Sequence, residues 1–143
     1  MGTQLNRVIE LLKEDQPVYY TGDHIGATLS RSKGKEAANT WADYINIGME
    51  HGSFDINGLG AFMQGLREGG PTNSGHTTPS VVVELPVVGS STEVVQANSW
   101  QITQILAKGV HGLVLCHAES AGAVRAFVEA CRYPFHRLGI GPN

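Results

Sequence analysis

The chain has 143 residues, of which 41% are hydrophobic and 16% are charged, which is the composition of an ordinary globular domain. Its formal charge is −3, and its Lys and Arg residues are scattered, whereas a nucleic-acid surface needs a basic stripe. No apolar run approaches the roughly 20 residues that cross a bilayer, so we expect one soluble, cytoplasmic domain over residues 1–143 that binds neither nucleic acid nor membrane.

Apolar residues follow helical and strand-like spacing in turn along the chain. A short amphipathic helix is predicted at about residues 3–14, and Pro17 ends it. Strands are predicted at 18–21, 44–49, 80–86 and 112–116. A loop and a helix are predicted through 27–42, and further helices at 56–67, 92–108 and 121–131. Residues 69–79 are rich in turn formers and are expected to form a loop. A fifth strand is expected to begin within 137–141.

Strands that alternate with helices in this way are typical of βαβ units and a parallel sheet. The right-handed crossover rule leaves two arrangements, an open doubly wound sheet and a barrel. In both of them, chemistry collects at the carboxyl ends of the strands. No glycine-rich phosphate loop follows any of the strands, which argues against a nucleotide-binding sheet.

Histidines and acidic residues stand where the predicted strands end. They are, in chain order, His24 after the first strand, Glu50 and His51 after the second, Glu84 in the third, and His117 and Glu119 after the fourth. Because parallel strands end at one edge of their sheet, we expect these groups to form an acid–base or metal-linked site. His76, in the loop at 69–79, is a further candidate for the same site.

Each candidate also has a structural interpretation that the sequence leaves open. His24 can cap the next helix, Glu50 can form a salt bridge at the sheet edge, and His76 can be a solvated loop residue. Asp55 is expected to be the N-cap of the helix that follows it. Glu50 and His51 are neighbours and would point to opposite faces of a strand, so both reach one site only if the strand ends before them.

An ordered set of these segments resembles the HpcH/HpaI aldolases of the phosphoenolpyruvate/pyruvate superfamily, over about residues 17–141. Asp43-Tyr44 is similar to a strand entry of that family, and Glu50-His51-Gly52-Ser53-Phe54-Asp55 to its E-H-(A/G)-x-x-D signature. Further on, the resemblance rests on Pro86, Lys108-Gly109-Val110-His111-Gly112, Cys116-His117-Ala118-Glu119-Ser120 and Cys131-Arg132-Tyr133-Pro134.

The resemblance implies the N-terminal (β/α)4 half of a TIM (β/α)8 barrel. It implies a metal-dependent carbon–carbon lyase that cleaves a hydroxy-2-oxo acid into pyruvate, or a related oxo acid, and an aldehyde. We expect His51 to transfer the proton and Glu50 to orient it, and the residues that contact the substrate to be His117, Glu119, Glu84, His24 and His76. A Mg²⁺ or Mn²⁺ ion would stabilise the enolate, with its ligands beyond Asn143.

The sequence departs from the family pattern at the third strand. An Arg that binds the oxo acid is usual there, and Glu84 takes its place with the opposite charge. Arg31 and Lys33 are candidates to replace it.

Four strands of a barrel also leave two edges unpaired, and such edges promote association. We therefore expect a partner, either the remaining half of the barrel or another subunit, and a homo-oligomer. The alternative function is a catalytically degenerate half-barrel that acts as an oligomerising or binding module.

Overall fold

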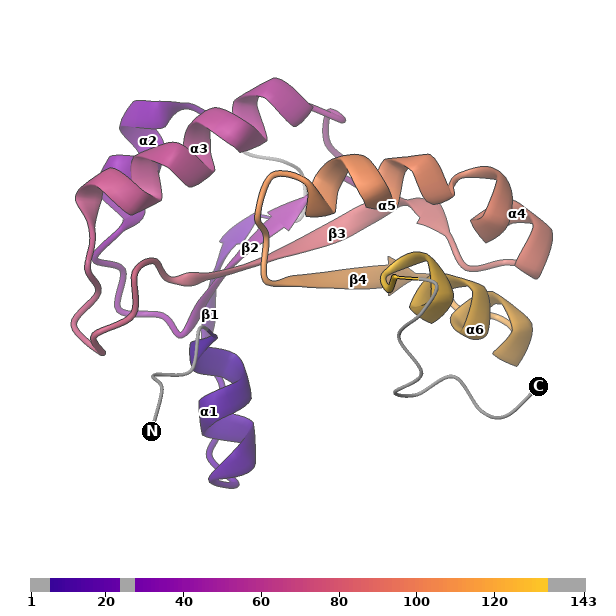
Figure 1. Ribbon diagram of the computed structural model, residues 1–143, viewed down its shortest axis with the longest axis horizontal. Helices are drawn as coiled ribbons and strands as arrows, with labels where there is room; N and C mark the ends of the chain where they lie inside the picture. Colours follow the sequence, from indigo (N-terminus) through magenta and orange to yellow (C-terminus); the bar gives the residue numbers. More distant parts are fainter. Residues whose placement is uncertain (1–5, 24–27, 134–143) are drawn as a thin grey trace.

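The computed structural model describes residues 6–23 and 28–133 and has an α/β architecture built on one parallel sheet. The strands follow one another across the sheet in chain order, as β1 (Tyr20–Asp23), β2 (Tyr44–Gly48), β3 (Ser80–Val88) and β4 (Gly112–Cys116). The helices of the described residues (Figure 1) are α1 (Arg7–Lys13), α2 (Arg31–Ala37), α3 (Ile56–Gly69), α4 (Thr92–Ala97), α5 (Ser99–Leu106) and α6 (Ala121–Ala130). The predicted parallel sheet with alternating helices is confirmed.

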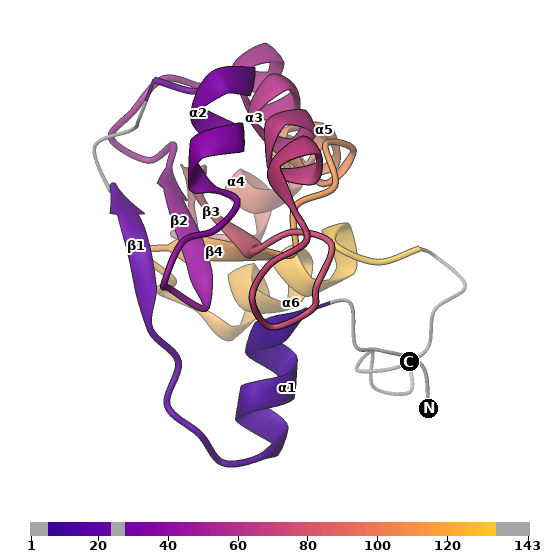
Figure 2. The ribbon, with the colours of Figure 1, turned by 90° about the vertical axis from the view of Figure 1, so that its left-hand side faces the viewer.

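The hydrophobic core lies between one face of the sheet and the helices. Figure 2 shows α2, α3 and α5 on one side of the strands. Every second strand residue points to this side and is almost fully buried, among them Ile45, Ile47, Val81, Val83 and Leu85. The helices complete the same cluster with Leu59, Met63, Leu66, Val95, Ile102, Ile105 and Ala123. Because strand side chains alternate between faces, Asn46, Glu84 and Val114 belong to the opposite face.

Helices α2 and α3 pack backbone to backbone at two glycines. A Cβ atom added to Gly34 would lie 2.1 Å from the carbonyl oxygen of Phe62, and one added to Gly65 would lie 2.1 Å from that of Arg31. No side chain fits at either distance, so the close crossing of the two helices requires glycine at both positions.

Helix α1 lies at the amino ends of the strands. Its N-cap residue, Asn6, accepts hydrogen bonds from the N–H groups of Val8 and Ile9. The same side-chain oxygen accepts a hydrogen bond from the Ser80 hydroxyl at the start of β3 (3.0 Å), and the amide nitrogen lies 3.4 Å from the carbonyl of His111. One residue therefore both starts the helix and attaches it to the sheet.

One predicted helix differs from the observed ones. The helix expected at 92–108 is two helices, because the side chain of Asn98 donates to the carbonyl of Val94 (2.8 Å) and the backbone leaves the helical conformation there. Asparagine side chains compete with the helical hydrogen bonds of the backbone in this way. The helix expected within 27–42 is α2, which begins at Arg31 because the Ser30 side chain accepts a hydrogen bond from Lys33 N–H and caps it.

The first and third strands also differ in their limits. The strand predicted at 18–21 is β1 at Tyr20–Asp23, because Tyr19 N–H donates to the carboxylate of Asp43 (2.9 Å) instead of joining the ladder. The third strand continues to Val88. His24 and the strand start expected at 137–141 lie outside the described residues. Within the described part of the chain, no helix has the length and apolar character to span a bilayer.

Candidate active site

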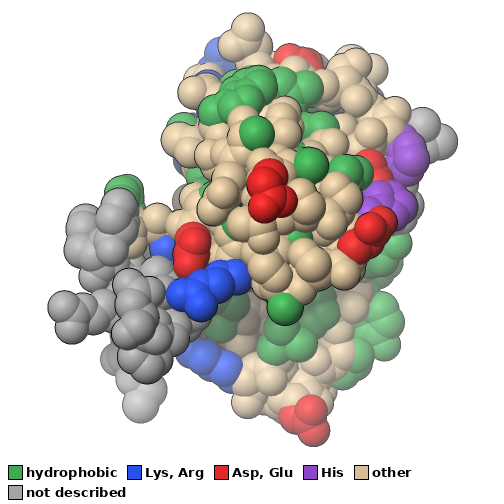
Figure 3. All heavy atoms as spheres, turned by 90° about the vertical axis from the view of Figure 1, so that its right-hand side faces the viewer, with side chains coloured by type: hydrophobic (Ala, Val, Ile, Leu, Met, Phe, Trp, Pro, Cys, Tyr) green, Lys and Arg blue, Asp and Glu red, His purple; other side chains and the backbone are tan. Residues whose placement is uncertain are grey.

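The side chain of Glu50 lies between two imidazoles just beyond the carboxyl end of β2. Its Oε1 is 2.6 Å from Nε2 of His117, and its Oε2 is 3.5 Å from Nε2 of His51. The carboxylate is mostly buried, whereas both imidazoles are about two-thirds exposed (64% and 67%). Figure 3 looks at the end of the molecule toward which β3 and β4 run, and shows histidines beside acidic side chains along one border. The arrangement suits proton exchange with a molecule bound at this edge.

The end of β2 explains how neighbouring residues serve one site. The strand ends at Gly48, and Met49 still donates its N–H to the carbonyl of Glu84 (3.0 Å) and is buried in the core. Glu50 comes one residue later and falls on the opposite face. His51 then lies in a bend, where its ring turns back toward Glu50. The strand thus ends before Glu50 and His51, which is the condition for both side chains to reach one site.

His117 is brought to Glu50 by the loop after β4. Its φ angle of 49° lies in the left-handed region, which non-glycine residues seldom adopt, although His does so more often than most. Hydrogen bonds on both sides fix this turn, from Gly89 N–H to the carbonyl of Cys116 (2.8 Å) and from Glu119 N–H to the carbonyl of Gly89 (2.9 Å). Such backbone conformations often occur at functional sites.

The pairing of β3 with β4 is irregular beside this contact. Glu84 pairs with Val114, and the next registered pair is Val88 with Cys116. Between these two pairs β3 advances by four residues and β4 by two, so the register shifts. Pro86 lies within this stretch, and it has no N–H to donate. The irregularity lets β3 reach Gly89 and support the loop that carries His117.

Cys116 ends β4 beside the site, and no sequence pattern marks it as functional. Burial, followed by interaction with the Glu50 carboxylate and the negative charge of Glu84, raises the pKa of Cys116 to about 12. The thiol therefore stays protonated at neutral pH. A cysteine that ends a β-strand is a weak signal, because buried cysteines commonly serve as small apolar residues.

Glu84 lies deeper on the same face of the sheet. Its Oε1 accepts a hydrogen bond from Nδ2 of Asn46 (3.0 Å), and both residues are buried. Nearby, the rings of Tyr20 and Tyr44 stack with centroids 5.2 Å apart. Burial, followed by the charges of Tyr20 and Glu84, raises the pKa of Tyr44. The face beneath the site is thus acidic and aromatic.

The two cations considered as replacements for the family's Arg are already paired. Arg31 forms a bidentate contact with Glu68, at 2.9 and 2.6 Å, and Lys33 lies 2.9 Å from Glu36. Both pairs lie on the helices, not on the face that carries Glu84. The charge reversal at Glu84 is therefore not compensated by either residue.

Other predicted residues lie elsewhere. Glu119 is exposed, and its backbone contributes to the loop described above. His76 is buried at the opposite end of the sheet, because α3 returns the chain to the amino edge. Its Nδ1 is 2.9 Å from the Ser74 hydroxyl, and its Nε2 is 3.3 Å from Glu10 without hydrogen-bond geometry. Asp55 is the expected N-cap, accepting from Gly58 N–H (2.8 Å).

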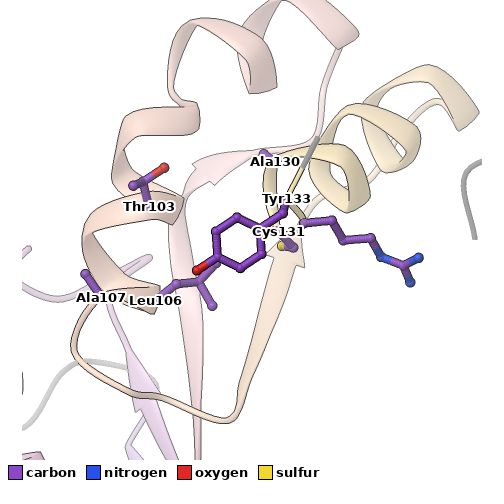
Figure 4. Close-up of a pocket in the computed structure, with 7 residues that line it drawn as sticks. Thr103, Leu106, Ala107, Ala130, Cys131 and Tyr133 are labelled. Atoms are coloured by element: carbon purple, nitrogen blue, oxygen red, sulfur yellow. The ribbon is translucent and has the colours of Figure 1, made fainter. Parts of the chain in front are cut away.

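A hollow of about 510 Å³ lies away from the Glu50 cluster, toward the amino edge. Figure 4 shows that its lining comes from the end of α5 and the end of α6, including Leu106, Ala130, Cys131 and Tyr133. None of the residues predicted to be functional lines it.

Comparisons with models of protein families, with curated proteins and with solved structures give no match to this chain. The resemblance to the HpcH/HpaI aldolases stays a prediction. Within the described ranges, no three His, Cys, Asp or Glu side chains are grouped so that they could hold a metal ion. The Mg²⁺ or Mn²⁺ ion, whose ligands are expected beyond Asn143, stays a prediction.

Proposed function

We propose that this chain supplies the proton-transfer part of a carbon–carbon lyase site that acts on a small oxo acid. The observation that carries the proposal is the Glu50 carboxylate held between His117 and His51 at the carboxyl edge of a parallel sheet. In α/β folds with parallel strands, this edge is where substrates bind.

The shorter contact assigns the roles within the cluster. Oε1 of Glu50 lies 2.6 Å from Nε2 of His117. In the proposed mechanism the neutral ring carries its proton on Nε2, beside the carboxylate, and its Nδ1 takes a proton from a substrate hydroxyl. In a retro-aldol cleavage, loss of the hydroxyl proton accompanies rupture of the C–C bond and leaves the oxo acid as its enolate. The imidazolium that forms is stabilised by the adjacent carboxylate. His51, exposed at 3.5 Å, is the second group that can carry a proton.

The substrate's carboxylate requires a cation, and neither Arg31 nor Lys33 supplies one on the face that carries Glu84. A Mg²⁺ or Mn²⁺ ion would chelate the oxo acid and stabilise the enolate. The resemblance to the aldolase family implies that the ligands of this ion lie beyond Asn143. The chain's own contribution is limited to proton transfer and orientation.

The proposal includes a barrel as the complete fold. All four strands are parallel and lie in chain order, which is the order found along one half of a (β/α)8 barrel. Four more β/α units, from the rest of the barrel or from another subunit, would pair with β1 and β4. They would enclose the face that carries Asn46 and Glu84.

The experiment is to incubate a protein that contains this chain with a panel of 4-hydroxy-2-oxo acids and Mg²⁺, Mn²⁺ or Co²⁺, and to measure pyruvate release. We expect turnover that EDTA abolishes and that His117→Ala strongly reduces. Glu36→Gln, which changes an exposed carboxylate on α2, is the matched control and is expected to keep full activity. No turnover with any acid and any of the three metals would overturn the proposal.

A second function, an oligomerising or binding module, is favoured by the sheet edges. Among the described residues, β1 and β4 each pair with a strand on one side only, and Val114 on the uncovered face is 41% exposed. Unpaired edges are templates for association. This function predicts an oligomer whose stability changes neither with EDTA nor with His51→Ala, which sedimentation measurements would detect.

A further inference from the structure

We infer that Gly89 is a positioning residue, which sets the place of the His117 imidazole beside Glu50. The inference rests on the proposed function of the Glu50–His117 pair and goes beyond it, because neither the sequence pattern nor the resemblance gave Gly89 a role. Gly89 has no side chain that could touch a substrate, and it acts through the backbone of the loop that carries His117.

Gly89 directly follows β3 and is hydrogen-bonded to both ends of this loop. Its N–H donates to the carbonyl of Cys116 (2.8 Å), and its carbonyl accepts the N–H of Glu119 (2.9 Å). In a regular parallel ladder, the two partners of one residue lie two positions apart in the neighbouring strand, whereas Cys116 and Glu119 lie three positions apart. The loop therefore contains one residue more than regular pairing allows, which is the definition of a β-bulge.

The bulge gives the His117 side chain its direction. His117 lies between the two bonded positions, and its φ angle of 49° is in the left-handed region. Bulges next to active sites re-aim a side chain in this way. Here the imidazole is directed across the end of β3, where its Nε2 lies 2.6 Å from Oε1 of Glu50. The hydrogen bonds of Gly89 thus hold the loop in the shape that makes this contact.

The space beside Gly89 admits no side chain. A Cβ atom added there would lie 2.9 Å from Cα of Ala118 and 2.9 Å from Cδ2 of Leu115. The leucine side chain has rotatable bonds, whereas Cα of Ala118 belongs to the loop backbone and can move only together with its neighbour His117. Gly89 is itself buried. Alanine at this position would therefore displace the loop and draw the imidazole away from Glu50.

The first test compares the imidazole signals of the full chain in ¹H–¹⁵N NMR spectra, with those of His117 assigned by their loss in His117→Gln. Glu50→Gln shows how far the His117 signals move when the carboxylate is neutralised. We expect Gly89→Ala to move them in the same direction. Glu50→Gln should then have a smaller effect when it is added to Gly89→Ala, because both changes act on one contact.

Gly65→Ala is the matched control. It also adds a methyl group to a tightly packed glycine, but at the α2–α3 crossing, where the nearest atom is the carbonyl oxygen of Arg31. It is expected to leave the His117 signals in place. Unchanged His117 signals in a folded Gly89→Ala variant would overturn the inference. Equal movement in Gly89→Ala and Gly65→Ala would also overturn it, because loss of stability would then be the cause.

If Gly89→Ala does not fold, hydrogen exchange of the unmodified chain decides. The amides of Gly89 and Glu119 both donate to carbonyls in the bulge. We expect them to exchange roughly tenfold or more slowly than unprotected amides. Exchange of either amide at the unprotected rate would mean that the loop is not held by Gly89, and it would reject the inference.

Activity separates this inference from the proposed function. If pyruvate is released, Gly89→Ala should lower kcat by roughly tenfold or more, because misplacing a group by about 1 Å can cost roughly 100-fold. Gly65→Ala should keep kcat at a temperature where both variants are folded, and equal kcat in the two variants would reject a positioning role. If no substrate turns over, the lyase proposal fails, while the NMR and exchange results still decide whether Gly89 positions His117.

Discussion

The carboxylate of Glu50 and the imidazole of His117 meet at 2.6 Å, although β3 lies between the strands that carry them. The contact crosses the carboxyl end of β3, where Glu84 and Val88 flank an irregular stretch and Gly89 supports the loop of His117. The closest pair in the site is thus made by residues 67 positions apart in the chain. The adjacent pair, Glu50 and His51, is the looser one at 3.5 Å.

The two histidines should contribute unequally to turnover. His117→Ala should lower kcat for pyruvate release by roughly 100-fold or more, the range for loss of a general acid–base group. His51→Ala should lower it by roughly tenfold or less, because this ring makes the longer contact with Glu50. Steady-state kinetics of both variants, with Glu36→Gln as control, gives the comparison. A larger loss of kcat in His51→Ala than in His117→Ala would indicate that His51 is the proton-transfer residue, as predicted from the sequence.

The α2–α3 crossing should be intolerant of a single methyl group. Gly65→Ala should destabilise the chain by about 1 to 3 kcal/mol, because the added carbon overlaps the Arg31 carbonyl and must force the helices apart. Gly60→Ala lies on the same helix, where the nearest atom to the added carbon is 3.5 Å away on Lys108. It should stabilise α3 by up to about 1 kcal/mol. Urea unfolding of both variants measures the difference, and similar midpoints would disprove the close crossing.

The N-cap of α3 should be measurable in the same way. Asp55→Ala removes the acceptor of the Gly58 N–H and should cost about 1 kcal/mol. Asp55→Ser keeps an acceptor at this position and should recover most of the loss. If Ala and Ser unfold at the same denaturant concentration, the side-chain cap does not contribute.

The amino edge should make the fold sensitive to mild acid. Burial, and then the charge of His76, lowers the pKa of His111, and its Nδ1 accepts the N–H of Val81 (3.0 Å). Protonation would remove that acceptor. Because the unfolded chain binds this proton more readily, stability should be fully present above the unfolded pKa of roughly 6.5 and should fall as the pH drops through it toward the lower folded value.

His111→Gln retains an acceptor that does not titrate. It should therefore lose less thermal stability than the unmodified chain when the pH is lowered from 7 to 5.5. His76 and Glu10 lie in the same cluster and stay unchanged in this comparison. A melting temperature that falls equally in both proteins would assign the acid sensitivity to other groups.

The sequence by itself determined the elements and their order. The run of β-branched residues at 81–83 predicts a parallel strand covered on both faces; in β3, Val81 and Val83 are fully buried on the helix-covered face, and Val82 on the other face is partly buried. Asp55 predicts the start of α3, and the alternation of strands and helices predicts parallel pairing. These features depend on the periodicity of side chains and on local capping, which a short stretch of chain already contains. The same signals placed Glu50 and His117 just after strands and Glu84 within the third strand.

Only the tertiary structure decided which of these residues meet. His76 is at the opposite edge because a helix reverses the chain direction after β2. Glu50 and His117 meet although β3 separates their strands. The pairing of Glu50 with His117 depends on an irregular register and on a left-handed residue. Such contacts arise from packing between strands distant in sequence, so no periodicity along the chain encodes them.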